Sequence, residues 1–300
     1  MNITLRQLAV FSAVVRRRSF TRAAEELHLS QPAVSMQVKQ LENQLQIPLL
    51  DQAGRKIALT EAGEEVFSYA RAILDKLDDL ETVLGNLKGL KQGKLRISVV
   101  TTVNYFAPTL LRTFHGRYPG VNVILDVANR QTLLEQLSEN EVDMVVMGQP
   151  PADMDLESDP FLENPLVIIA PEGHPLTGKL SIPLKRLEDE VFLIREPGSG
   201  TRDAMERFFS SHGIRITTGM EVSGVDALKQ SVQAGLGLGL MSRDAVQMEL
   251  SLGRLVTLDI EGFPIRRHWY LVHRRPKRLS APALAFKAFV LNEAADLLEN

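Results

Sequence analysis

The segment Ser19–Leu41, SFTRAAEELHLSQPAVSMQVKQL, limits what this chain can fold into more than any other stretch. Its apolar residues Val34, Val38 and Leu41 recur at spacings of four and three, which places them on one narrow stripe of a helix. Ser30 is a residue type that favours the N-cap of such a helix. The segment therefore predicts two short helices joined by a tight turn, the second helix having one apolar and one polar face.

The polar face of the second predicted helix offers groups that bind DNA. Hydroxyl, amide and ammonium side chains reach base edges and phosphates, and a helix N-terminus presents free N–H groups to a phosphate. A helix-turn-helix unit lays its second helix in the major groove, whereas two amphipathic helices that only pack together are the alternative. The residues predicted to contact DNA, including two from a basic turn that follows, are Arg22, Ser30, Gln31, Pro32, Ala33, Ser35, Met36, Gln37, Lys39, Gln40, Arg55 and Lys56.

Charge is distributed unevenly along the chain. Residues 1–60 contain eight cations and four acids, a net charge of +4, whereas the whole chain of 300 residues has a net charge of −3. A basic segment joined to an acidic remainder is typical of a nucleic-acid-binding domain attached to another domain. The first 18 residues lack the layout of a secretory signal, and no apolar run approaches a membrane span, so we expect a cytoplasmic protein with no membrane partner.

A hairpin and a long helix are expected next. Two short apolar runs flank a turn at Gly54, which predicts a small β-hairpin. From about Thr60 to Gly89, apolar residues alternate at spacings of four and three, the a/d pattern of a helix that pairs with another helix. We expect this helix to join two copies of the chain, although packing on its own domain is the alternative. The predicted dimer contacts are Val66, Ile73, Leu77, Leu80, Leu84 and Leu87.

From Lys94 onward the pattern changes to alternating strands and helices. The apolar runs KLRISVV, VNVILDV and VDMVVMG are separated by amphipathic segments, a βαβαβ arrangement that predicts a parallel sheet covered by helices. A second set begins at PLVIIAP, and a last strand, HWYLVHR, precedes a C-terminal helix. The fold class is therefore α/β, preceded by a mainly helical N-terminal domain.

A ligand site is expected where strands of these sheets end and helices begin. The turn EPGSGTR at residues 196–202 presents backbone N–H groups, two hydroxyls and one guanidinium, which suits a small anion; a tight turn without a ligand is the alternative. The residues predicted to bind this ligand are Thr101, Thr102, Gly148, Gln149, Pro150, Glu196, Ser199, Gly200, Thr201, Arg202, Val225 and Asp226.

Two other function classes fit the sequence poorly. The run GLGLG at residues 235–239 invites a dinucleotide-binding interpretation, but it follows a helix and enters a strand, the reverse of the order that such a loop needs. The chain has no cysteine and no HExxH, GxSxG or Walker motif, so we expect no catalytic residues, no metal and no cofactor. A solute-binding protein is disfavoured by the basic N-terminal segment.

The motif SFTRAAEELHLSQPAVSMQVKQLE, the LTEAG that opens the long helix and the two α/β halves together resemble the LysR-type transcriptional regulators over the whole chain. Within that family, SQPAVSMQVKQLE, SVVTTVNYFAP and REPGSGTRDAMERFF are most similar to the CbbR group, which regulates RuBisCO and Calvin-cycle genes. The resemblance implies a winged helix-turn-helix at 1–60, a linker helix at 61–92, and two Rossmann-like subdomains of periplasmic-binding-protein type at 93–162 with 268–300 and at 163–267.

The resemblance also implies partners and an effector. It implies an activator that binds double-stranded promoter DNA as a homodimer or homotetramer and that contacts RNA polymerase. Its effector would be a phosphorylated sugar, phosphoenolpyruvate or NADPH, and binding would change the angle between the subdomains. Met36 and Gln52 stand where many family members have arginine, which puts a guanine contact at Met36 in doubt. Control of another metabolic operon is the alternative within the family.

Overall fold

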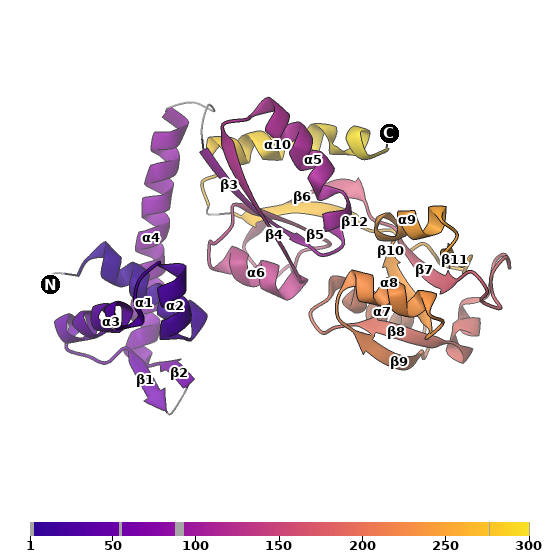
Figure 1. The fold of residues 1–300 in the computed structure, drawn as a ribbon, viewed down its shortest axis with the longest axis horizontal. Coiled ribbons are helices and arrows are strands. Elements are labelled where there is room, and N and C mark those ends of the chain that lie inside the picture. The colour runs from indigo at the N-terminus through magenta and orange to yellow at the C-terminus, as the bar shows by residue number, and fades with distance from the viewer. Residues whose placement is uncertain (1–2, 54–55, 88–92, 276, 300) are drawn as a thin grey trace. The chain divides into compact units, whose positions relative to one another are not determined.

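The computed structural model describes residues 3–53, 56–87, 93–275 and 277–299. The chain divides into two compact units, residues 1–84 and 85–300 (Figure 1). Within the described ranges, no helix combines the length and the apolar character needed to cross a membrane.

The first unit is a small bundle of helices with one hairpin. Thr4 starts its first helix with a capping box to Gln7, and Ser30 Oγ accepts a hydrogen bond from the backbone N–H of Ala33, 3.4 Å away, at the start of the third. The third helix ends at Gln46, whose φ of 57° lies in the left-handed region. The elements of this unit are α1 (Leu5–Arg17), α2 (Phe20–Glu26), α3 (Gln31–Leu45), β1 (Leu50–Ala53), β2 (Lys56–Leu59) and α4 (Glu61–Leu87).

The predicted hairpin is present, since β1 and β2 pair in antiparallel register. Its base is fastened to α3, because Glu42 Oε1 accepts hydrogen bonds from the backbone N–H groups of Leu49 at 2.8 Å and Leu50 at 3.2 Å. The predicted stripe, Val34, Val38 and Leu41, is buried against α1 and α2. The stripe therefore packs inward, which leaves the opposite face of α3 toward solvent.

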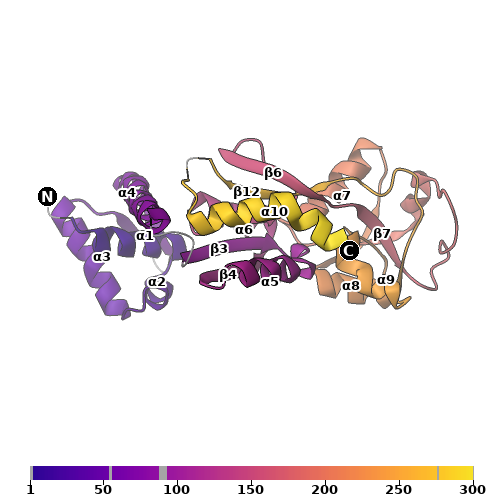
Figure 2. The ribbon, with the colours of Figure 1, turned by 90° about the horizontal axis from the view of Figure 1, so that it is seen from above.

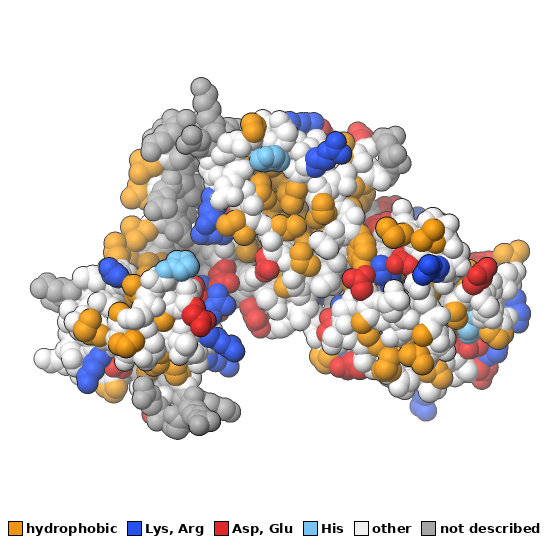
Figure 3. Space-filling view, viewed as in Figure 1, with side chains coloured by type: hydrophobic (Ala, Val, Ile, Leu, Met, Phe, Trp, Pro, Cys, Tyr) orange, Lys and Arg blue, Asp and Glu red, His pale blue; other side chains and the backbone are white. Residues whose placement is uncertain are grey.

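Among the side chains that the structure describes, helix α4 contacts the core of the first unit near its beginning. Ala70 is fully buried there, and Val66 packs against the same cluster. Farther along, Ile73, Leu80 and Leu84 are exposed, and Figure 3 shows apolar side chains along this helix. An amphipathic helix of this length buries its apolar seam against a partner when one is available. The predicted pairing with a second chain stays a prediction, and the side chain of Leu87 lies outside the described residues.

The first sheet of the second unit has the strand order β4-β3-β5-β12-β6. Strand β3 is parallel to both of its neighbours, whereas β12 arrives from the far end of the chain and is antiparallel to β5 and β6. The elements of this part are β3 (Gly93–Val100), η1 (Val103–Tyr105), α5 (Ala107–Arg117), β4 (Val121–Ala128), α6 (Arg130–Ser138), β5 (Met144–Met147), β6 (Leu156–Glu163), β12 (His268–Arg274) and α10 (Ala281–Glu299).

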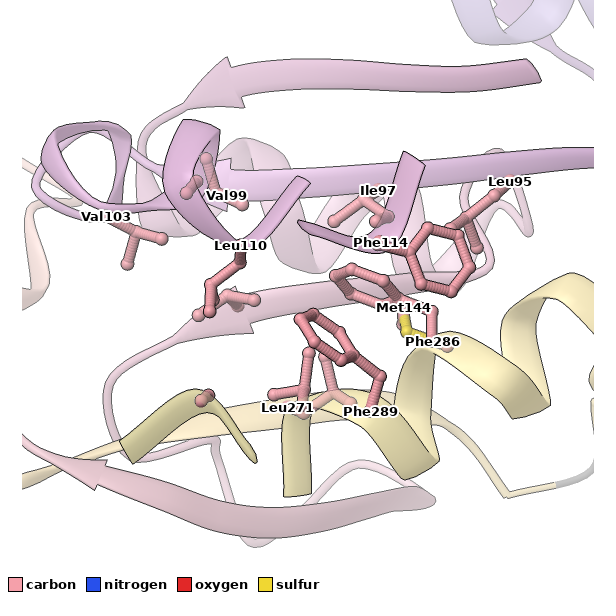
Figure 4. Close-up of a cluster of buried hydrophobic side chains, with 14 of the residues drawn as sticks. Leu95, Ile97, Val99, Val103, Leu110, Phe114, Met144, Leu271, Phe286 and Phe289 are labelled. Carbon is pink, nitrogen blue, oxygen red and sulfur yellow. The ribbon is translucent and has the colours of Figure 1, made fainter. Parts of the chain in front are cut away.

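Helices cover both faces of this sheet. Figures 1 and 2 show α5 and α10 on one face, where Phe114 packs edge-to-face on Phe286 with ring centroids 5.1 Å apart (Figure 4). On the other face, Leu133 and Leu137 of α6 pack against β5. Because both faces are covered, strand β5 in the interior of the sheet is apolar and buried along its whole length, as the sequence indicated.

The second sheet has the strand order β11-β7-β10-β8-β9, with α7 and α8 on its opposite faces. The elements of this part are β7 (Leu166–Pro171), η2 (Leu184–Asp189), β8 (Val191–Arg195), α7 (Gly200–Ser211), β9 (Thr217–Val222), α8 (Val225–Gln233), β10 (Leu238–Ser242), η3 (Arg243–Val246), α9 (Gln247–Ser251) and β11 (Leu255–Thr257). The run at residues 235–239 joins α8 to β10, helix before strand, as predicted.

Candidate functional site

The polar face of α3 is exposed as the sequence indicated. Met36, Lys39 and Gln40 are exposed, and Ser35 is half-buried beside them. The other predicted residues of this helix are exposed or half-buried, and its N-terminus is capped by Ser30. A helix that presents a hydroxyl, an ammonium and an amide on one face can enter the major groove and reach base edges.

Some of the cations near this helix are paired with acids. Glu26 binds the guanidinium groups of Arg16 at 2.6 Å and Arg17 at 2.5 Å, so these two arginines hold α1 and α2 together. Arg22 is exposed on α2. Arg55 and the side chain of Lys56, both predicted to touch DNA, lie outside the described residues.

A pocket of the second unit opens at the carboxyl ends of β3, β4 and β5 in the first sheet and of β8 in the second, the position expected for a ligand in an α/β sheet. The N-termini of α6 and α7 begin at its wall, so backbone N–H groups are directed to it. The lining residues are Val100, Thr101, Thr102, Asn129, Arg130, Gly148, Asn164, Leu166, Arg195, Ser199, Gly200, Thr201, Ser242, Arg267 and Trp269.

Half of the predicted ligand-binding residues lie in the lining of this pocket and half do not. The six in the lining are Thr101, Thr102, Gly148, Ser199, Gly200 and Thr201. The six outside it are Gln149, Pro150, Glu196, Arg202, Val225 and Asp226. Arg202 is directed elsewhere, because its guanidinium binds Glu206 at 2.8 Å and Glu221 at 2.7 Å and donates to the carbonyl of Arg195.

Arg267 is the group that most determines the chemistry of the pocket. Burial, together with the neighbouring charges of Arg207 and Arg130, lowers the pKa of Arg267 to about 10, which still leaves it charged at neutral pH. Its Nη1 donates to the carbonyl of Gly200 at 3.2 Å. A Cβ atom built at Gly148 would lie 2.2 Å from Nη2 of Arg267, so the absence of a side chain at Gly148 makes room for the guanidinium.

Two cations of the pocket lack a carboxylate partner. Among the described residues, neither Arg267 nor Arg130 forms an ion pair, and Arg130 Nη2 only donates to the carbonyl of Gln149 at 3.4 Å. Arg195, the third cation, is paired with Glu196 at 2.7 Å and donates to Thr101 Oγ1 at 3.4 Å. Arg267 and Arg130 are half-buried, and a cation that has lost part of its contact with water is stabilised when an anion binds beside it.

The pocket also contains polar atoms without a hydrogen-bond partner. Asn164 and Ser242 are each 1 % exposed, and Asn164 Oδ1 and Ser242 Oγ accept or donate no hydrogen bond within the described part of the chain. Ser199 is the N-cap residue of α7, but its hydroxyl does not cap the helix. Such groups are normally satisfied, so their presence together indicates a site that binds a polar molecule.

Sequence reasoning missed the three arginines of the pocket. Asn129 and Arg130 follow β4 directly and open α6, so the rule that located Thr101 applies to them as well. Arg195 ends β8 one residue before the predicted turn. Arg267 precedes β12 in an irregular segment, and no local pattern marks it. Among the residues described, no cluster of acids and histidines could hold a metal ion.

The comparisons with known proteins agree with this geometry. Residues 5–64 match the family described as "Bacterial regulatory helix-turn-helix protein, lysR family", and residues 88–295 match "LysR substrate binding domain". The predicted fold class, with a helical DNA-binding domain and two α/β subdomains, is that of this family.

Relatives cover nearly the whole chain. A "RuBisCO operon transcriptional regulator" of Allochromatium vinosum is 55% identical over 98% of both chains. "HTH-type transcriptional regulator CbbR" of Rhodospirillum rubrum is 45% identical over 95% of each. The regulatory domain of CcmR from Synechocystis PCC6803, solved in complex with 2-PG, is 40% identical, with a TM-score of 0.65 over 67% of this chain and 96% of that one. The chain belongs to the LysR family of bacterial transcriptional regulators.

Proposed function

We propose that this protein regulates carbon-fixation genes by binding their promoter DNA through α3, in response to a small phosphorylated metabolite held in the pocket of the second unit. The observation that carries the effector part is the set of three arginines in a pocket whose lining includes no acid. Phosphate groups are the anions that guanidinium groups bind in two-point geometry. The relatives named for the RuBisCO operon support the choice of target genes.

The pocket residues have separate roles in this proposal. Arg267 and Arg130, which have no carboxylate partner, neutralise the phosphate, while the N-terminus of α7 donates backbone N–H groups to it. Thr101, Ser199 and Thr201 supply hydroxyls for the rest of the metabolite. Effectors of the same size that lack charge leave the guanidinium groups unpaired and bind weakly.

We further propose the division of the chain given in the sequence analysis, with a linker helix that pairs two copies. The exposed positions Ile73, Leu80 and Leu84 on α4 are the contacts for this pairing. A dimer presents two recognition helices to two half-sites of a promoter. Assembly of two dimers into a tetramer and contact with RNA polymerase belong to the same proposal.

Calorimetry on the full chain tests the effector. We titrate 2-PG, phosphoenolpyruvate, a phosphorylated sugar and NADPH, with the unphosphorylated sugar as the matched control. We expect at least one phosphate to bind with one site per chain and to raise the melting temperature as its concentration rises. If none of the four binds at millimolar concentration, the proposed effector class is wrong.

The salt dependence of DNA binding tests the basic surface of the first unit. We expect the affinity for the intergenic DNA beside the gene to fall steeply with salt, because phosphate contacts release counterions. Arg22→Gln should reduce the slope of log affinity against log salt by about one, with similar loss on every DNA sequence. A slope that is unchanged in the variant would show that Arg22 makes no phosphate contact.

A further inference from the structure

A side-chain cluster at the far end of the Thr101–Tyr105 segment joins the two sheets of the second unit. Tyr105 ends η1, four residues after the pocket residue Thr101, and its hydroxyl donates a hydrogen bond to Asp226 Oδ1 at 2.6 Å. Asp226 lies in the first turn of α8, which covers the second sheet. The hydrogen bond therefore connects a segment of the first sheet to a helix of the second.

Lys229 holds both partners of this hydrogen bond. It lies one turn after Asp226 on α8, is only 4 % exposed, and its Nζ lies 3.2 Å from Asp226 Oδ1. The same ammonium lies 4.4 Å from the centroid of the Tyr105 ring, within the range of a cation–π interaction. Tyr105 is thus held through its hydroxyl and through its ring.

Lys229 is itself fixed by two more segments. Its Nζ binds Glu249 Oε1 of α9 at 2.9 Å and donates to the carbonyl of Ala245 in η3 at 3.2 Å. Burial by itself lowers the pKa of Lys229, but the hydrogen bonds with Glu249, Tyr105 and Asp226 outweigh burial and raise it. The ammonium stays charged, and its three donors have partners.

The cluster restricts the segment that carries two pocket hydroxyls. Thr101 and Thr102 line the pocket, and Val103, between them and Tyr105, is fully buried in the core of the first sheet. A short segment anchored at its strand, at Val103 and at Tyr105 has little freedom left, so its hydroxyls are held in one place before a ligand binds. Preorganisation of this kind increases affinity, because ordering is not left to the binding step.

We propose that Tyr105, Asp226 and Lys229 are positioning residues for the effector: they hold the Thr101–Tyr105 segment against the second sheet, so that Thr101 and Thr102 face the bound phosphate metabolite. This inference rests on the proposed function, because it takes the pocket as the effector site. It also gives Asp226, which the sequence placed among the ligand contacts, a role through Tyr105 instead of direct contact.

The test uses two variants of the full chain and their combination. Tyr105→Phe removes one hydroxyl and keeps the ring over Lys229, and Asp226→Ala removes the acceptor. Calorimetry with 2-PG should show that each variant binds severalfold more weakly, less than the loss of a fully buried hydrogen bond, because the side chain of Asp226 is 83 % exposed. Because both changes break the same contact, the double variant should have the same affinity for 2-PG as the single variant with the lower affinity. Additive losses would mean that Asp226 contacts the ligand itself, and would overturn the proposal.

A second measurement does not depend on the ligand. Hydrogen exchange at the backbone amides of residues 101–106, in protein without effector, should be severalfold faster in Tyr105→Phe than in the wild type. The control is Tyr118→Phe, the same chemical change on a ring that packs on Phe114 in α5, outside the pocket lining. It should leave both exchange at these amides and affinity unchanged.

The two measurements separate the possible failures. If the wild type binds 2-PG and Tyr105→Phe binds it equally well, the positioning role is wrong while the effector site stands. If the wild type binds none of the phosphates, the proposed function is wrong, and hydrogen exchange alone then decides whether the cluster orders the segment. Unchanged exchange in Tyr105→Phe overturns the proposal in either case.

Discussion

Changing Ser35 and Lys39 together to alanine should abolish recognition of the promoter while the first unit stays folded. Lys39 is exposed and Ser35 is half-buried, and neither belongs to the buried stripe of α3, so the change leaves the core intact. Alanine is the best helix former, and the helix should be as stable as before. Loss of one base contact and one phosphate contact should weaken binding by about 2–4 kcal/mol, roughly 30- to 1,000-fold in Kd.

A gel-shift titration with the intergenic DNA measures this loss, and circular dichroism shows whether the helices are retained. Gln44→Ala is the matched control, because Gln44 is exposed near the C-terminal end of the same helix and is not among the predicted contacts. It should bind DNA as the wild type does. If the double variant of Ser35 and Lys39 also binds within threefold of the wild type, α3 is not the recognition helix.

Arg267→Met should separate effector binding from stability. Methionine keeps much of the length and the apolar stem of arginine but removes the charge of this half-buried side chain. Since the guanidinium has no carboxylate partner among the described residues, its removal should leave stability against urea unchanged or higher. Loss of a charge-assisted contact to phosphate should weaken effector binding by about 3 kcal/mol, roughly a hundredfold.

The matched control for this experiment is the adjacent residue, since Arg266 is exposed and outside the pocket lining. Arg266→Met should leave effector binding unchanged. A variant at Arg267 that is both less stable and equally able to bind the metabolite would mean that Arg267 is structural. A general loss of folding would lower both stability against urea and effector affinity. A variant that loses affinity while keeping its stability therefore shows a role for Arg267 in binding.

The elements with a clear period were predictable from the sequence. The cap at Ser30 located the start of α3, and the stripe of Val34 and Val38 identified its buried face, because a local cap and a local helical pattern are both visible in the chain. Strand β5 was visible as a continuous apolar run, the pattern of a strand covered on both faces, and β3 as apolar residues interrupted by Arg96 and Ser98.

Strands β6 and β11 were not predicted, and the reasons differ. Strand β6, LESDPFLE, lies at the edge of the first sheet and contains acids and a proline, which an edge strand tolerates. Strand β11 has only three residues, too few to show a period. Both strands are defined by their neighbours in the sheet and not by their own residues.

The candidate site was predictable only where sequence neighbours form it. Thr101, Gly148 and the turn around Ser199 were found because they directly follow strands. Arg267 reaches the pocket because the chain crosses back toward the first sheet at that point. Asp226 accepts a hydrogen bond from Tyr105, which lies 121 residues earlier in the chain. Contacts of this kind follow from tertiary packing, which local patterns do not contain.

The place of β12 between β5 and β6 has a consequence for synthesis of the protein. Strand β12 separates β5 from β6, although the ribosome makes it some 100 residues after both of them. Until residue 274 has left the exit tunnel, β5 and β6 are unpaired on that side, so the emerging chain exposes two open strand edges while the second sheet is already complete. A product that ends before residue 267 would lack both β12 and Arg267, so its first sheet would keep the open strand edges that favour aggregation and its pocket would be incomplete.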